Sequence, residues 1–302
     1  VAGPILRFSQ VSERLRGIKT FSPSREDQIS AVLLFTFGLS FKVLIADTIG
    51  RYASPQIAVP LSGDVLSRLF VIFGYSIQIY FDFSGYSDMA IGLARLFGIK
   101  LPQNFYSPYK AMNIIEFWRR WHITLSRFLR DYLYIPLGGS RHGTARTGLA
   151  VLITMLLGGL WHGAAWSFVV WGGLHGFLVV IECVMTGSRF LWSGSIWLRR
   201  FLIFHFVTIA WAFFRAPSFE RALDVLGGVL NPGDFASVLN TPLIPVLIIG
   251  TIMLHPVDTF GSINRISERL PGGIVFPLSI MLILIHAALS VDNPSAFIYF
   301  DF

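Results

Sequence analysis

The stretch that decides the fold is residues 147–181, TGLAVLITMLLGGLWHGAAWSFVVWGGLHGFLVVI, 35 residues without an Asp, Glu, Lys or Arg. A helix needs about 20 apolar residues to cross the roughly 30 Å hydrocarbon core of a bilayer, so this stretch is too long for one crossing. Gly158, Gly159 and Gly163 interrupt it. We therefore expect two membrane helices that meet near His162.

The composition of the whole chain also indicates a membrane protein. Of its 302 residues, 54% are hydrophobic and 14% are charged, against roughly 25% charged in an average soluble domain. Five further apolar runs approach or reach spanning length: Gln28–Ile49, Leu66–Leu96, Phe201–Phe214, Phe235–Val257 and Leu270–Val291. No repeat or linker divides the chain. We expect an all-α, polytopic integral membrane protein with a single domain over residues 1–302.

The positive charge is concentrated between Arg95 and Arg146. This stretch contains nine Lys and Arg residues but only two acidic residues, Glu116 and Asp131. Basic segments beside membrane spans usually lie on the cytoplasmic side. Because the arginines alternate with bulky apolar residues, anionic lipid headgroups are the expected partners rather than nucleic acid.

Residues 107–142 form an amphipathic, basic segment within this stretch. Asn113 and Glu116 have the spacing of a capping box, which predicts a helix start. An apolar stripe at three- and four-residue steps follows: Phe117, Trp121, Leu125, Phe128 and Tyr132. The opposite side is mostly basic: Arg119, Arg120, Ile123, Arg127 and Arg130. The pattern predicts one helix that ends near Pro136 and lies in the membrane interface or in a cleft at the membrane surface.

His162 stands out among the seven histidines because glycines flank it within an apolar segment. The glycines allow close backbone approach or leave room for a ligand. An imidazole has a reference pKa of about 6.5 and can act as a general base near neutral pH. From spacing alone, a structural histidine remains an equal alternative.

Other polar residues have structural interpretations beside their functional ones. His122, on the flank of the amphipathic segment, points into a cleft or bonds to a neighbouring helix. Asp82 belongs to a polar cluster at residues 80–88 and forms either a cavity wall or an ion pair with Arg119, Arg120 or Arg130. Packing or solvation accounts for the remaining histidines and for the lone cysteine: His142, His175, His205, His255, His286 and Cys183.

Several catalytic classes lack their sequence signatures. We find no GxSxG, P-loop, GxGxxG or HExxH motif, which removes support for serine hydrolases, nucleotide hydrolases, dinucleotide oxidoreductases and zinc proteases. No pairing of histidines and carboxylates has convincing metal-ligand spacing, so no metal and no bound cofactor are expected.

Several ordered motifs together resemble the membrane-bound O-acyltransferase (MBOAT) family, and most closely its bacterial branch that acetylates alginate and alanylates teichoic acid. The matching stretches are AGPI (2–5), YFDFSGYSDM (80–89), EFWRRWH (116–122), RDYLYIPLGG (130–139), GGLWHG (158–163) and FIYF (297–300). The resemblance implies a many-helix fold around a central tunnel. It marks His162 as essential and His122 as the second candidate. It also implies further helices before residue 1, and the chain is expected to start partway into a longer protein.

The resemblance implies acyl transfer, acetyl being the expected group, from a cytoplasmic thioester to a hydroxyl. The donor would be acyl-coenzyme A or an acyl-carrier protein. The acceptor would be an exported, alginate-like polysaccharide or a periplasmic or extracellular partner that relays the group. The expected location is the bacterial inner membrane, with several crossings. Further residues are expected to bind substrate or line the tunnel: Trp161, Gly159, Gly163, Arg119, Arg120 and Asp82.

Two other functions remain open from the sequence. Buried charges and paired glycines also suit a transporter or flippase, although such proteins often contain inverted repeats and none is visible here. A scaffold for polysaccharide export would need neither His122 nor His162.

Overall fold

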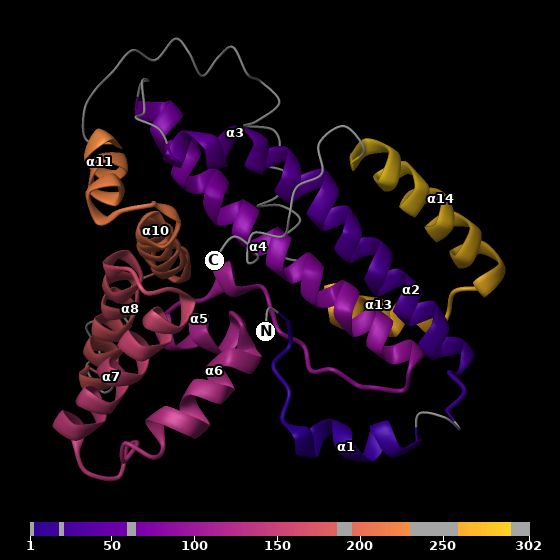
Figure 1. The fold of residues 1–302 in the computed structure, drawn as a ribbon, viewed down its shortest axis with the longest axis horizontal. Helices are drawn as coiled ribbons and strands as arrows, with labels where there is room; N and C mark the ends of the chain where they lie inside the picture. Colours follow the sequence, from indigo (N-terminus) through magenta and orange to yellow (C-terminus); the bar gives the residue numbers. More distant parts are fainter. Residues whose placement is uncertain (1–2, 18–20, 59–64, 186–194, 230–258, 291–302) are drawn as a thin grey trace.

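The computed structural model describes residues 3–17, 21–58, 65–185, 195–229 and 259–290, and Figure 1 shows their arrangement. Regular structure in these ranges is helical, without a strand. The α-helices are α1 (Phe8–Gly17), α2 (Arg25–Ser40), α3 (Asp47–Ala58), α4 (Val65–Leu96), α5 (Ile114–Arg120), α6 (Ile123–Leu129), α7 (Thr144–His162), α8 (Trp166–Val184), α10 (Ile196–Arg215), α11 (Phe219–Val229), α13 (Thr259–Ser267) and α14 (Gly272–Ser290). A π-helical turn over Phe41–Ala46 joins α2 to α3.

Five helical stretches within the described residues are long and apolar enough to cross a membrane. They are Arg25–Arg51, α7, α8, α10 and α14. The two helices predicted over residues 147–181 are confirmed, and they meet between His162 and Trp166 as expected. The run predicted at 235–257 lies outside the described residues.

The helices form two groups that are joined by α10 and α11 (Figure 1). In one group α4 packs against α2 and α3, and α14 packs on the other side of α2. The helix α13 contacts both α2 and α4. In the other group α7 packs along α8, with α5 and α6 beside them. The helix α10 contacts both α8 and α4. The core between the two groups contains large aromatic side chains, among them Trp121 and Trp211, which are no more than 1% exposed.

Glycines bring the spanning helices into direct backbone contact. A Cβ at Gly38 of α2 would overlap the carbonyl oxygen of Gly85 in α4, and a Cβ at Gly85 would overlap that of Gly38. Small residues of this kind allow close packing between membrane helices, where the hydrophobic effect cannot draw them together.

The helix α4 carries Asp82 into the protein interior. Its carboxylate lies 2.6 Å from the ammonium group of Lys42 in the π-helical turn, and Lys42 also lies 2.6 Å from Asp47. The ion-pair interpretation of Asp82 is confirmed, but the predicted arginine partners are wrong. The sequence did not indicate Lys42 as the partner, because Lys42 is 40 residues away from Asp82 and lies close to it only when α2 packs on α4.

The segment 107–142 differs from the single helix predicted for it. The helix breaks at Trp121, which is extended, and His122, which has a left-handed backbone with φ of 40°. The N–H of Ile123 donates to the carbonyl of Asn104, and the carbonyl of Arg120 accepts from Tyr106, each at 2.9 Å. These bonds to the irregular segment at residues 104–106 replace the helical hydrogen bonds at the break.

The two halves of the predicted stripe also separate. Phe117, Trp121 and Leu125 are at most 2% exposed, whereas Phe128 is 38% and Tyr132 is 53% exposed. The first half therefore lies in the protein core rather than in the membrane interface. The predicted capping box is half correct: Asn113 caps the N–H of Glu116, but the Glu116 side chain accepts from the N–H of Met112 instead of Asn113.

Candidate active site

His162 is the last residue of α7 and is enclosed by aromatic rings. Its ring centroid lies 4.9 Å from that of Trp161, 5.3 Å from that of Trp171 and 5.0 Å from that of Phe214. Only 8% of the residue is exposed. The site brings together side chains from α7, α8 and α10, so all three helices must be packed for His162 to adopt this environment.

His122 lies at the break between α5 and α6 and is 1% exposed. Its ring packs edge-on against Phe83 of α4, with centroids 4.7 Å apart. Burial, chiefly, and the neighbouring imidazole of His162 hold the pKa of His122 well below its usual value. His122 is therefore neutral at physiological pH.

Asn104 determines which nitrogen of His122 carries the proton. The side-chain oxygen of Asn104 accepts from the N–H of Thr124 at 3.2 Å and from its hydroxyl at 2.9 Å, and it lies 3.1 Å from Nδ1 of His122. Since this oxygen can only accept, Nδ1 must be the protonated nitrogen in the neutral ring. Nε2 then carries the lone pair, and this buried atom has no hydrogen-bond partner in the described part of the chain.

The other predicted site residues have structural contacts. Trp161 packs on His162 but is 43% exposed. A Cβ at Gly159 would overlap the carbonyl oxygen of Phe168, and one at Gly163 would overlap the Phe168 ring. Both glycines thus allow α7 to contact α8 closely, and a larger residue at either position would push the helices apart.

The two arginines expected to bind the donor differ from each other. Arg119 is exposed. Arg120 forms an ion pair with Glu116 at 2.7 Å, and its guanidinium also donates to the carbonyl of Tyr106. Arg120 therefore holds α5 against the irregular segment around Tyr106.

Residues 1–218 match the profile described as "MBOAT, membrane-bound O-acyltransferase family". That match covers more than half of the chain and includes both histidines. The chain belongs to the membrane-bound O-acyltransferase family.

Individual relatives agree with this MBOAT assignment. The chain is 41% identical over 233 residues to the peptidoglycan O-acetyltransferase of Helicobacter pylori, covering 76% of the chain and 44% of that protein. It is 40% identical over 266 residues to the probable alginate O-acetylase AlgI of Pseudomonas putida, covering 84% and 52%. It is 28% identical over 239 residues to the teichoic acid D-alanyltransferase of Bacillus subtilis, covering 73% and 59%. The chain spans about half the length of these relatives.

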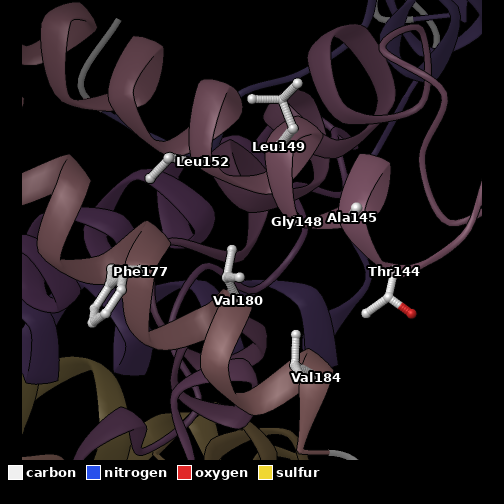
Figure 2. Close-up of a pocket in the computed structure, with 8 residues that line it drawn as sticks. All are labelled: Thr144, Ala145, Gly148, Leu149, Leu152, Phe177, Val180 and Val184. Carbon is white, nitrogen blue, oxygen red and sulfur yellow. The ribbon is translucent and has the colours of Figure 1, made fainter.

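One groove in the described part of this MBOAT chain does not include His162 in its lining. It has a volume of about 350 Å³ and is lined by Thr144, Ala145, Gly148, Leu149, Leu152, Phe177, Val180 and Val184 (Figure 2). Along α7, at about 1.5 Å per residue, the lining residues Thr144 and Leu152 lie about 27 Å and about 15 Å from His162. The lining is almost wholly apolar, which suits the hydrocarbon region around α7 and α8.

The remaining histidines have packing or surface roles, as predicted where the structure describes them. His175 is fully buried among Phe117, Trp118, Trp171 and Phe206. Nδ1 of His205 and of His286 each contact a carbonyl one turn earlier, and His142 is exposed. His255 lies outside the described residues.

Sequence reasoning missed Asn104 and Glu182. Asn104 lies in an irregular segment with no motif, and its importance arises from contacts with residues about 20 positions later. Glu182 carried a visible signal, a carboxylate at the end of an apolar span, and ionisable residues in such spans are functional candidates.

Proposed function

We propose that this chain is the histidine-bearing part of a membrane enzyme that transfers an acyl group, acetyl in the first instance, to a hydroxyl. The observation that carries the proposal is the burial of two histidines in the aromatic core, His122 after α5 and His162 at the end of α7. The family and the relatives, which are named as O-acetyltransferases and a D-alanyltransferase, support the same reaction type.

In the proposed reaction His162 is the general base. It takes the proton of the acceptor hydroxyl while that oxygen attacks the carbonyl carbon of a thioester donor. The carbon–sulfur bond then breaks, and the leaving thiolate recovers the proton from His162 as a thiol. General-base assistance of this kind typically contributes about 10²–10⁴-fold.

His122, as the neutral tautomer protonated on Nδ1, has a different proposed role from that of His162. Its unpartnered Nε2 accepts a hydrogen bond from the acceptor hydroxyl or from an N–H of the donor. A neutral imidazole with its lone pair toward the ligand cannot donate to a developing oxyanion. We therefore assign His122 to positioning rather than to charge stabilisation.

The donor is proposed to enter from the cytoplasmic side. Arg141 in the loop before α7 and Arg146 in the first turn of α7 are both exposed, and basic segments beside membrane spans favour the cytoplasm. His162 then lies toward the opposite face, where an exported polysaccharide or a relay partner would arrive. The donor would be acyl-coenzyme A or an acyl-carrier protein, and the location would be the bacterial inner membrane.

The test uses His162→Gln in the full-length protein. Acyl content of the acceptor polysaccharide is measured in a strain that carries only the variant, with membrane insertion checked in parallel. We expect a loss of at least 100-fold in the transfer rate. The matched control is His205→Gln, another histidine in a spanning helix, which should retain activity. Wild-type acylation by His162→Gln would favour the scaffold function instead.

A further inference from the structure

The first turn of α5 is capped by a residue from a different helix. The first N–H groups of any helix lack partners within that helix. Ile114 and Ile115 donate theirs to one carboxylate oxygen of Glu182, at 2.9 and 3.3 Å, and Glu116 donates its own to the side chain of Asn113 at 2.6 Å. Glu182 lies in α8, so two of these three bonds join α5 to a spanning helix.

Burial of an ionisable side chain at the position of Glu182 has a free-energy cost. The residue is 7% exposed and lies in the last turn of a helix long and apolar enough to cross a membrane. An ionisable side chain at the centre of a spanning helix costs at least about 2.5 kcal/mol on insertion scales, less toward the ends, and such residues usually face protein partners. Here the partners are the backbone donors of α5.

The other end of α5 leads directly to His122. The helix has seven residues, so it is about 10 Å long. Along its length Phe117 packs on His175, and Trp118 packs on Trp171, with ring centroids 6.0 and 5.8 Å apart. Trp171 in turn contacts His162. A displacement at the start of so short a helix is therefore transmitted to both histidines.

We propose that Glu182 is a positioning residue for acyl transfer, which fixes α5 on α8 and thereby sets the placement of His122 relative to His162. This inference rests on the proposed function. The proposal requires a side chain at position 182 that is long enough to place an acceptor oxygen beside the N–H groups of Ile114 and Ile115. It does not require a negative charge, because a neutral oxygen can also accept from backbone N–H groups.

A second use of Glu182 would depend on its charge. The carboxylate also lines a cavity of about 270 Å³ together with Asn113, Arg199 and Phe206. If Glu182 acted by its charge toward a ligand or toward Arg199, then Asp would replace it better than Gln. The two substitutions therefore separate the two roles.

The experiment compares Glu182→Gln, Glu182→Asp and Glu182→Leu in the full-length protein, with Glu220→Leu, an exposed carboxylate at the start of α11, as the control. We expect Gln to stay within about threefold of the wild-type kcat. Asp is one methylene shorter than Glu, and Leu has no acceptor oxygen. Each of these two variants should lower kcat about tenfold, which corresponds to roughly 1.4 kcal/mol, and should leave the KM for the donor unchanged. Activity of Asp above that of Gln, or wild-type kcat in all three variants, would overturn the proposal.

Amide hydrogen exchange of the peptide covering residues 113–121 gives a readout that does not require activity. Exchange should rise in the Leu and Asp variants and stay at the wild-type level in Gln. This keeps the two proposals distinguishable: retained activity in His162→Gln would remove the catalytic assignment, whereas unchanged exchange in Glu182→Leu would remove the contact between α8 and α5. A loss of kcat that disappears at lower temperature, in step with thermal unfolding, would also contradict positioning.

Discussion

The side-chain oxygen of Asn104 lies 3.1 Å from Nδ1 of His122 while it accepts two hydrogen bonds from Thr124. This arrangement places the proton of the neutral ring on Nδ1 and leaves the lone pair on Nε2. The proposed role of His122 depends on that lone pair, so a change at Asn104 should act on the reaction through the protonation of His122.

Asn104→Asp should make transfer sensitive to pH. The pKa of His122 is held well below its usual value by burial and by His162, and a carboxylate at hydrogen-bond distance raises a histidine pKa by about 1–3 units. Below the raised pKa, Nε2 is protonated and cannot accept. Transfer should therefore fall about tenfold or more as pH decreases through that range and recover as pH rises. The pH–rate profile measures this.

The control for that variant is Asn264→Asp in α13, which adds the same charge beside Arg95 instead of beside His122. Its profile should match the wild type. An Asn104→Asp profile that also matches the wild type would show that His122 does not need to be neutral.

Gly159→Ala should destabilise the fold. The added Cβ would overlap the carbonyl oxygen of Phe168 and force α7 away from α8, and overpacking of this kind costs about 1–3 kcal/mol. Thermal unfolding in detergent should show a lower Tm. Gly173→Ala is the matched control, because its Cβ would lie 3.5 Å from Leu156, an ordinary contact. Equal stability of the two variants would contradict the close packing of α7 on α8.

Asp82→Asn should also lower the Tm. The substitution removes one carboxylate from the buried Lys42, whose side chain is 7% exposed, and breaking a buried ion pair costs a few kcal/mol. Because Asp47 still pairs with Lys42, we expect about 2 kcal/mol. Adding Lys42→Met should lower the Tm further, because it takes away the ammonium group that lies 2.6 Å from the Asp47 carboxylate. Equal stability of the double variant and of Asp82→Asn would show that the Lys42–Asp47 pair does not stabilise the fold.

The sequence predicted those parts of the fold that depend on local composition. The uncharged run at 147–181 and its glycines were sufficient to predict α7, α8 and their junction at His162. The capping residue Asn113 located the start of α5. The apolar periodicity predicted that this helix continues through His122, and that prediction was wrong. The hydrogen bonds that replace the helical ones at the break come from residues 104–106, and the periodicity of residues 113–132 does not indicate them.

The sequence indicated the two histidines proposed for the site, but not the residues that surround them. His162 was selected by its glycines and by family resemblance. The partner of Asp82, the contact of Asn104 with His122 and the cap that Glu182 provides all join residues that are 18 or more positions apart. Their discovery required the packing of α2 on α4 and of α5 on α8.

The most direct test of the account measures acyl transfer across a bilayer by the full-length protein in oriented proteoliposomes. Labelled thioester donor is supplied on the side of the loop before α7, with any relay partner and the acceptor only on the opposite side. The account predicts labelled acceptor with the wild type and with His205→Gln, and none with His162→Gln. Product that forms only when donor and acceptor share a compartment, or that forms equally with His162→Gln, would contradict it.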